Sequence, residues 1–291
     1  MQVFLENEQL KVTINSFGGE LSSIVKKQTG TEYMWNADEK YWKRTSPVLF
    51  PIVGSLKNKE FIYGGKSYPM GQHGFARDME FELKSKEDGE VWFSLKSDEE
   101  TLKKYPFAFC LELGYRLNEN KLDVLWRVMN EDTKEMYFSI GGHPAFMCPL
   151  KGEGEQTDYY IAFDNEKDLE YSVLNEDGLV AIEGEVLSTN GGMMPIAADL
   201  FDRDALIIEG KQAKKVSLCD KNKKPYLSVS FDSPLFGLWS PAGKHAPFVC
   251  IEPWYGRCDK ASFEGTLEER EYGNVLKPGE VFEKEYRVEI I

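Results

Sequence analysis

Short segments of alternating apolar and polar residues, separated by tight-turn residues, constrain the fold of this 291-residue chain most strongly. Residues 79–83 and 91–95 both alternate with a period of two, and Asp88-Gly89 lies between them. In a β-strand this period places successive side chains on opposite faces, so that one face is buried and the other is wet. Asp-Gly is a typical hairpin turn. The pattern therefore predicts antiparallel strands joined by hairpins.

The same pattern extends over most of the chain, whereas helical periodicity is almost absent. Gly64-Gly65 predicts a hairpin within residues 60–68. The other predicted strands are residues 3–5, 10–14, 21–25, 107–117, 122–129, 159–163, 169–174, 179–182, 205–208, 216–219, 226–231, 235–239, 248–251 and 283–291. Residues 101–104 and 197–201 are each expected to form about one helical turn. Many short strands favour an all-β sandwich or barrel. Since no linker-like segment divides the chain, we expect one domain over residues 1–291.

Charge and cysteine content limit the partners and the location that we expect. The net charge of −14 opposes binding to nucleic acid and to anionic lipid. No apolar run is long enough to span a membrane, and the first 15 residues lack the apolar core of a signal peptide. The five cysteines are widely spaced without a CxxC motif, which is typical of reduced thiols. We therefore expect a cytoplasmic protein without nucleic-acid or membrane partners.

Two of the three histidines stand in similar surroundings. His73 lies in QHGF and His143 lies in GGHPAF, so both are flanked by glycine and an aromatic residue. Pro144 restricts the backbone of His143 to an extended conformation, and glycine lets a ligand or another backbone approach closely. Two such histidines in a histidine-poor chain predict a functional site. The third histidine, His245, is expected in a loop.

Three further residues are candidates for this site. Glu252 follows the apolar residues 248–251, so we expect its carboxylate to be part-buried, with a pKa suited to a general base. Trp254 can pack on the apolar face of a sugar ring. Arg44 precedes a proline-stiffened segment and offers a rigid fork of hydrogen-bond donors. Considered alone, each of these residues also fits a purely structural role.

Most chemistries that use histidine and a carboxylate lack support in the sequence. Metal binding by two histidines and a glutamate has no HExxH motif or other local ligand spacing. Serine hydrolysis lacks a GxSxG segment, and neither Cys148 nor Cys250 has a nucleophile signature. No glycine-rich phosphate loop opens a helix. General acid–base catalysis without metal or cofactor requires only a carboxylate opposite an imidazole.

Four motifs together resemble those of the aldose 1-epimerase (galactose mutarotase) superfamily, and most of all its LacX-like branch. They are RTSPVLFPIVG, QHGFARD, GGHPAF and IEPW, in that order between Arg44 and Trp254. The resemblance implies a large antiparallel β-supersandwich. It also implies an isomerase that interconverts the anomers of a small-molecule sugar and needs neither metal nor cofactor.

The resemblance assigns catalytic roles to three residues. Glu252 would remove the proton from the anomeric hydroxyl, and His143 would give a proton to the ring oxygen. The ring opens, the C1–C2 bond rotates, and the two groups exchange roles as the ring closes. His73 would hydrogen-bond the sugar and help to polarise the reacting oxygen. Each positioned proton transfer accelerates such a reaction by roughly 10²–10⁴-fold.

The resemblance also assigns residues to substrate binding. Arg44 and Arg77 match arginines that contact substrate in the relatives, and Asp204 matches an aspartate that binds sugar hydroxyls. Asp202 is a rival for that role. The larger galactose mutarotases carry an Asn-Arg pair where this chain has Lys43-Arg44, which leaves the identity of the sugar open.

Two alternative functions stay open from the sequence. A hexose-6-phosphate 1-epimerase would need a basic cluster, which the fold could build from Lys43, Arg44, Lys57, Lys59 and Arg77. A non-catalytic protein that binds or senses carbohydrate could use the same fold. The presence of both histidines and the glutamate argues against it, because binding alone needs no proton donor opposite a base.

Overall fold

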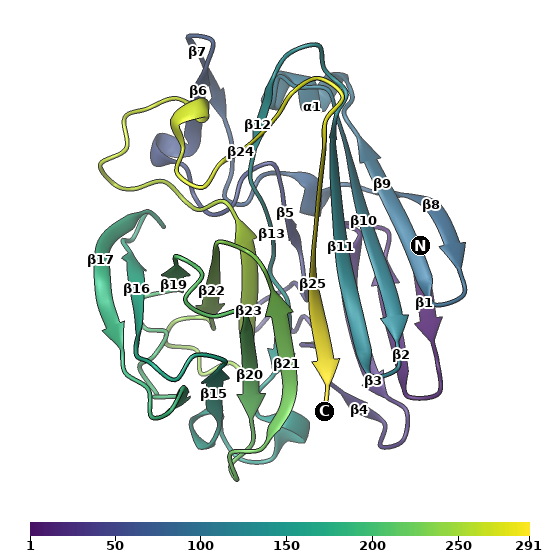
Figure 1. The fold of residues 1–291 in the computed structure, drawn as a ribbon, viewed down its shortest axis with the longest axis vertical. Helices are drawn as coiled ribbons and strands as arrows, with labels where there is room; N and C mark the ends of the chain where they lie inside the picture. The colour runs from purple at the N-terminus through teal and green to yellow at the C-terminus, as the bar shows by residue number, and fades with distance from the viewer.

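The computed structural model describes residues 1–291, and its regular secondary structure is mainly antiparallel strands (Figure 1). A four-stranded sheet has the order β1-β2-β3-β4 (Gln2–Glu6, Leu10–Asn15, Glu20–Lys26, Thr31–Glu32). Two small sheets pair β6 with β7 (Glu60–Tyr63, Lys66–Pro69) and β12 with β24 (Met136–Phe138, Asn274–Leu276). The predicted hairpin within residues 60–68 is confirmed.

A nine-stranded sheet joins the two halves of the chain. Its order is β18 (Met193–Pro195), β15 (Tyr160–Phe163), β20 (Lys215–Cys219), β21 (Pro225–Phe231), β25 (Val281–Ile290), β11 (Lys121–Asn130), β10 (Phe109–Asn118), β9 (Glu90–Lys96) and β8 (Glu82–Glu87). The C-terminal strand β25, yellow in Figure 1, lies between β21 and β11. It therefore connects strands that come from opposite halves of the sequence.

An eight-stranded sheet carries the motifs that the sequence singles out. Its order is β17 (Val180–Leu187), β16 (Leu169–Leu174), β19 (Leu206–Glu209), β22 (Leu235–Trp239), β23 (Phe248–Tyr255), β13 (Ile140–Gly142) and β5 (Val48–Leu49), with β14 (Ala145–Met147) also paired to β23. The central strand β23 contains Glu252 and Trp254, and its neighbour β13 leads directly to His143.

Helices contribute little. The one α-helix, α1 (Glu99–Lys104), begins after Asp98, whose carboxylate accepts hydrogen bonds from the first-turn amides. The 3-10 turns are η1 (Lys57–Lys59), η2 (Ala76–Asp78), η3 (Leu150–Gly152), η4 (Gln156–Asp158) and η5 (Leu267–Glu269). No helix has the length and apolar character needed to cross a membrane.

Two local predictions are wrong. Residues 197–201 form turns rather than a helical turn. The strand predicted at residues 79–83 begins only at Glu82. The amide of Met79 donates to the Ala76 carbonyl and so ends the η2 turn. Phe81 is buried, whereas the edge strand that follows it is exposed. The alternation there reflects one buried aromatic residue between a turn and a strand.

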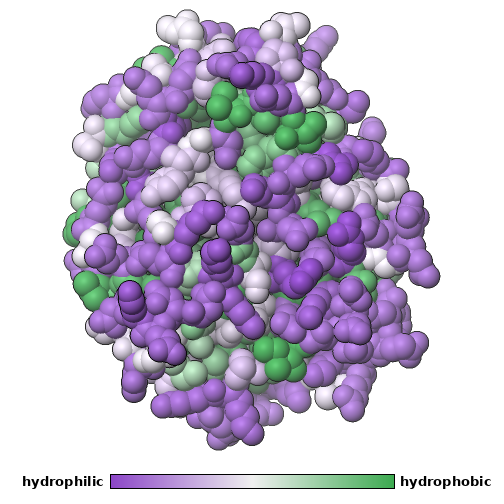
Figure 2. Space-filling model, viewed as in Figure 1, coloured by the Kyte–Doolittle hydropathy of each residue, from purple (hydrophilic) through white to green (hydrophobic).

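The hydrophobic faces of the three large sheets meet in one interior. Val12 of β2, Val128 of β11 and Ile251 of β23 are fully buried members of the same 64-residue cluster. Burying so many apolar side chains is the main stabilising contribution in a fold of this kind. The prediction of an antiparallel all-β protein is confirmed. The face shown in Figure 2 is mostly hydrophilic, and its apolar side chains form small separate groups.

Candidate active site

Strand β23 forms one wall of the site and carries the candidate base. Glu252 is 1% exposed and lies within the strand, opposite Gly237 of β22. The sequence led us to expect a part-buried residue at the end of a strand, but β23 continues through Pro253 to Tyr255. Since side chains alternate along a strand, Glu252 and Trp254 project from the same face.

Trp254 occupies space that two glycines leave open on the neighbouring strands. A Cβ atom at Gly141 would lie 2.6 Å from the indole, and one at Gly237 would lie 2.7 Å from it. The indole therefore lies across both flanking strands, which no larger residue at these positions would allow. Trp254 is 4% exposed, and its edge lines the pocket described below.

His73 has a left-handed backbone, with a φ of 66°, and is held by a pair of hydrogen bonds to Gly54. Its Nδ1 accepts a bond from the Gly54 amide (3.0 Å), and its own amide donates to the Gly54 carbonyl (2.9 Å). Burial lowers the pKa of His73 well below its ordinary value of 6.5, and the positive charges of Arg77 and Arg44 act in the same direction. The ring is therefore neutral with its proton on Nε2, so that it can donate one hydrogen bond to a bound molecule.

His143 follows β13 and faces Glu252. Its Nε2 lies 3.4 Å from Oε2 of Glu252, and both side chains are buried. The backbone amide of His143 donates to the Pro47 carbonyl (3.1 Å), which fixes the main chain at this point. Neither Nδ1 of His143 nor Oε2 of Glu252 has a hydrogen-bond partner in the protein. Buried polar atoms of this kind are uncommon outside functional sites.

Burial acts on the two groups in opposite directions. It lowers the pKa of His143 to about 3, with a smaller contribution from the positive charge of Arg77. It raises the pKa of Glu252 well above 4.5, and the nearby Asp204 carboxylate adds to this shift. At a pH between the lowered pKa of His143 and the raised pKa of Glu252, the two side chains share one titratable proton. This proton can lie on either residue without exchange with solvent.

The predicted binding residues differ in their placement. Arg77 and Asp204 line the same pocket as the acid–base pair, whereas Asp202 does not. Burial lowers the pKa of Arg77 to about 10, and its Nε has no hydrogen-bond partner. Arg44 lies outside the lining, where its Nη2 pairs with Asp78 (2.6 Å). His245 is exposed, as expected for a loop histidine.

The pocket has a volume of about 230 Å³ and brings together residues from distant segments. Glu252, His143, His73, Arg77, Asp204 and Trp254 all line it. Its lining also includes Trp42, Gln72 and Trp239, which the sequence analysis did not select. Gln72 precedes His73 in the QHGF motif, so its position could have been anticipated. The two tryptophans carry no local motif.

Cys250 is the one further group beside the pair that could bind a metal ion. One ligand atom each from His143, Cys250 and Glu252 lie within 4.8 Å of one another. Burial, with the Glu252 carboxylate, raises the pKa of the Cys250 thiol well above 9, and burial raises that of Cys148 to about 12. Because the thiolate is both the metal ligand and the nucleophile, these thiols are poorly suited to either role at neutral pH.

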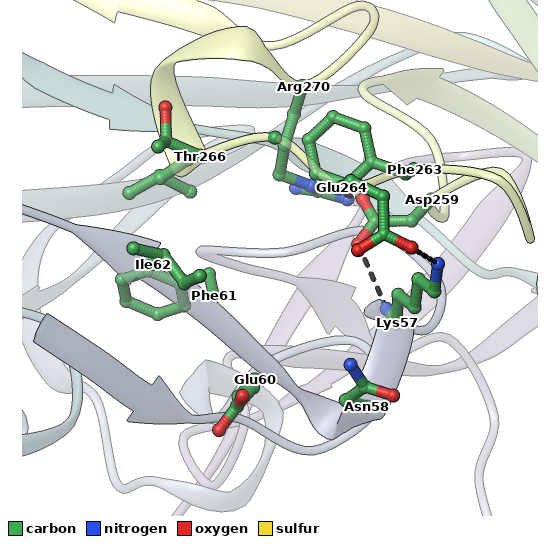
Figure 3. A pocket seen from close by; sticks show the side chains of 12 residues that line it. Lys57, Asn58, Glu60, Phe61, Ile62, Asp259, Phe263, Glu264, Thr266 and Arg270 are labelled. Carbon is green, nitrogen blue, oxygen red and sulfur yellow. Dashed lines mark hydrogen bonds and ion pairs between the residues drawn. The ribbon is translucent and has the colours of Figure 1, made fainter. Parts of the chain in front are cut away.

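A second, smaller hollow lies between η1, β6 and η5 (Figure 3). Apart from Glu60, its charged groups are paired with one another. Lys57 forms an ion pair with Glu264, and Nε of Arg270 lies 2.7 Å from Asp259. The Asp259 carboxylate also accepts a bond from the Lys57 amide (2.9 Å). These pairs link the loop before η5 to η1, and they leave no unpaired cation in the lining; the remaining carboxylate, Glu60, accepts a hydrogen bond from Ser67.

The fold and the pocket define an antiparallel β-protein with a buried histidine–glutamate pair, and comparison with known proteins gives the family. Residues 1–289 match the family described as aldose 1-epimerase. The match covers nearly the whole chain, including every motif between Arg44 and Trp254. The protein therefore belongs to the aldose 1-epimerase family.

Individual relatives place the chain within that family. It is 33% identical over 300 residues to the protein LacX (chromosomal) of Lactococcus lactis subsp. lactis, with 100% of both chains covered. A galactose mutarotase related enzyme from Lactobacillus acidophilus has a TM-score of 0.94 and 36% identity, and the match covers 100% of this chain and 97% of that one. A galactose mutarotase-like protein from Lactobacillus casei has a TM-score of 0.92 and 32% identity, with 100% of both chains covered. The LacX-like branch and the galactose mutarotase-like supersandwich are both confirmed.

Proposed function

We propose that the protein is an aldose 1-epimerase that interconverts the α and β anomers of a free hexose. The observation that carries this proposal is the buried pair of His143 and Glu252, whose facing atoms lie 3.4 Å apart in the wall of a pocket. Opening a sugar ring requires removal of one proton and delivery of another. A carboxylate and an imidazole at this separation can do both.

The reaction leaves the protonation of the pair balanced. With the shared proton on His143, the Glu252 carboxylate takes the proton of the anomeric hydroxyl. His143 gives its proton to the ring oxygen, the bond from C1 to that oxygen breaks, and the aldehyde forms. After rotation about C1–C2, His143 takes the proton back from the hydroxyl, and Glu252 returns its proton to O1. No proton has to come from solvent at any step.

The remaining lining residues suit a neutral polyhydroxyl substrate. The neutral ring of His73 offers an Nε2–H donor, and Nε of Arg77 has no hydrogen-bond partner. Asp204 supplies acceptors for sugar hydroxyls, and Trp254 supplies an apolar edge. Holding the sugar against both the acid and the base lowers the entropic part of the barrier.

Polarimetry on freshly dissolved α-glucose and α-galactose tests this function. We expect the wild-type protein to accelerate the decay to the anomeric equilibrium. Glu252→Gln and His143→Asn should each lower the rate by roughly 10²-fold or more, because each removes one proton-transfer group. His245→Asn is the matched control, since it makes the same change at an exposed histidine outside the pocket, and it should keep the wild-type rate.

Two results would overturn the proposal. Wild-type activity in Glu252→Gln or His143→Asn would reject the acid–base roles. Absence of acceleration on both sugars by the wild-type protein would reject the activity on free hexoses, and sugar binding without acceleration would then indicate a carbohydrate-binding protein.

The charge around the pocket favours a free sugar over a 6-phosphate. Of the five basic residues that could form a phosphate site, only Arg77 lines the pocket. Lys57 is paired with Glu264 and Arg44 with Asp78. A phosphate usually needs several converging donors. We therefore expect glucose 6-phosphate to be a poorer substrate than glucose in the same assay.

A further inference from the structure

The orientation of the His143 ring is not fixed by a hydrogen bond. In many sites the second nitrogen of a functional imidazole donates to a carbonyl or carboxylate, which sets the ring plane and the tautomer. Here Nδ1 is buried and has no partner, and Nε2 faces Glu252. Packing against neighbouring side chains must therefore set the orientation of the His143 ring.

Aromatic rings enclose this imidazole. The indole of Trp42 is stacked on its face, with ring centroids 4.7 Å apart and planes 29° apart. Trp239 and His73 are T-shaped to it, with ring centroids 5.3 Å and 5.6 Å away. Of these three rings, only Trp42 lies nearly parallel to the imidazole, so it is the stacked contact that limits tilting of the ring away from Glu252.

Trp42 is itself held by the protein. It lies in the irregular segment between β4 and β5, and its carbonyl accepts a bond from Nε1 of Trp35 (2.8 Å). Trp35 is buried and packs on Phe248 of β23 at 4.7 Å. The indole of Trp42 also contacts Trp239 at 5.5 Å. The segment is therefore anchored to the same strand that carries Glu252.

Stacking on an indole also favours the charged form of the ring. A cation over the face of tryptophan is stabilised by the ring quadrupole, and the effect is larger where water is excluded. His143 is 7% exposed, so the contact with Trp42 is largely desolvated. Trp42 thus offsets part of the cost of placing the shared proton on His143.

We propose that Trp42 is the positioning residue of the acid–base pair: it holds the His143 imidazole toward Glu252 and stabilises the imidazolium that donates to the ring oxygen. The kinetic consequence rests on the proposed function, whereas the effect on the imidazole does not. The competing role for Trp42 is to stack directly on the sugar, since this residue also lines the pocket.

The first test is made on the protein without sugar, by ¹⁵N NMR of the His143 ring in the wild type, Trp42→Phe and Trp42→Leu. With three histidines in the chain, the signals can be assigned from His143→Asn. In the wild type we expect the ¹⁵N chemical shifts of the two ring nitrogens to be well separated, as for one fixed tautomer. Trp42→Leu should move the two chemical shifts toward their average, and Trp42→Phe should give a separation between those of the wild type and Trp42→Leu. Unchanged separation in Trp42→Leu would overturn the proposal.

The second test separates turnover from binding. A positioning role predicts that Trp42→Leu lowers kcat about tenfold, which is the range of a desolvated cation–π contact, with little change in KM. Trp42→Phe should recover most of the loss. Trp92→Leu, which removes a partly exposed indole from β9, is the matched control and should keep wild-type kinetics. A raised KM with unchanged kcat in Trp42→Leu would identify a sugar-stacking wall and overturn the proposal. If the wild type turns over no sugar, the NMR comparison still shows whether Trp42 positions the His143 ring.

Discussion

Glu252 shows how one residue links burial, stability and chemistry. An ionised carboxylate is costly in a buried position without ion-pair or hydrogen-bond partners. The fold raises the pKa of this side chain and leaves its Oε2 unpartnered beside His143. The protein therefore sacrifices stability at neutral pH to keep a proton that the pair can pass between its members.

This cost gives a pH-dependent prediction for Glu252→Gln. In the unfolded chain the carboxyl ionises near 4.5, whereas in the folded protein burial keeps it protonated to higher pH. Above 4.5 the folded state thus binds more protons than the unfolded state, so the free energy of unfolding of the wild type falls as pH rises. The slope is at most about 1.4 kcal/mol per pH unit. Glutamine cannot ionise, so the variant should gain stability relative to the wild type as pH rises.

Urea unfolding of both proteins between pH 4 and pH 8 measures the difference. His143 is present in both, so its own titration largely cancels. A constant difference across this range would mean that Glu252 ionises in the folded protein much as it does in the unfolded chain.

At the residue scale, the sequence predicted those members of the pocket that lie in recognisable motifs. His73, His143 and Glu252 stand beside glycine or proline in unusual local contexts, and the fold brings all three to one pocket. Trp42 and Trp239 could not be found in this way. Their role arises from stacking between segments distant in sequence, and a tryptophan in a loop resembles any other part-buried aromatic residue.

At the scale of elements, the loop that carries His73 depends on Gly74. This glycine has a φ of +69°, and a Cβ atom there would lie 2.3 Å from the Phe50 carbonyl oxygen. The amides of Phe75 and Ala76 both donate to that carbonyl, so it has little freedom to move away. The contact fixes the loop against β5 and so aligns His73 with the pocket.

We therefore predict that Gly74→Ala destabilises the protein more than a positive φ alone explains. Gly65 in the β6–β7 turn is the matched control, because its φ is +73° and a Cβ atom there would meet nothing within 4 Å. The loss in free energy of unfolding for Gly74→Ala, minus that for Gly65→Ala, gives the cost of the steric clash. We expect this cost to be about 2 kcal/mol, as for overpacking of a rigid interior. Equal losses in urea unfolding for the two variants would show that the loop shifts freely.

Elements were predictable to the extent that local pattern specifies them. Long alternating strands such as β10 and β11 follow from periodicity, and the β6–β7 hairpin follows from its Gly-Gly turn. Strands of two or three residues, such as β5 and β13, are too short to show a period. Sheet order was not predictable either, since the pairing of β25 with β11 and β21 joins residues more than 50 positions apart.

At the scale of the whole molecule, that pairing makes the two halves of the chain interdependent. β25 is the only strand between β11 and β21, and its buried residue Val288 lies opposite Leu122 on one side and Val229 on the other. The residues of all three large sheets also share one core. Neither half can bury its apolar surface without β25 in place.

We accordingly predict that residues 1–291 unfold as one domain. In calorimetry the measured enthalpy of unfolding should equal the van't Hoff enthalpy of a single transition. Val288→Ala should lower the stability by about 2 kcal/mol, as expected for a buried aliphatic truncation, and should keep one transition. Glu285→Ala, at an exposed position of the same strand, serves as the control and should change little. Two transitions in the wild type, or a second transition exposed by Val288→Ala, would mean that the halves fold separately and that β25 only bridges them.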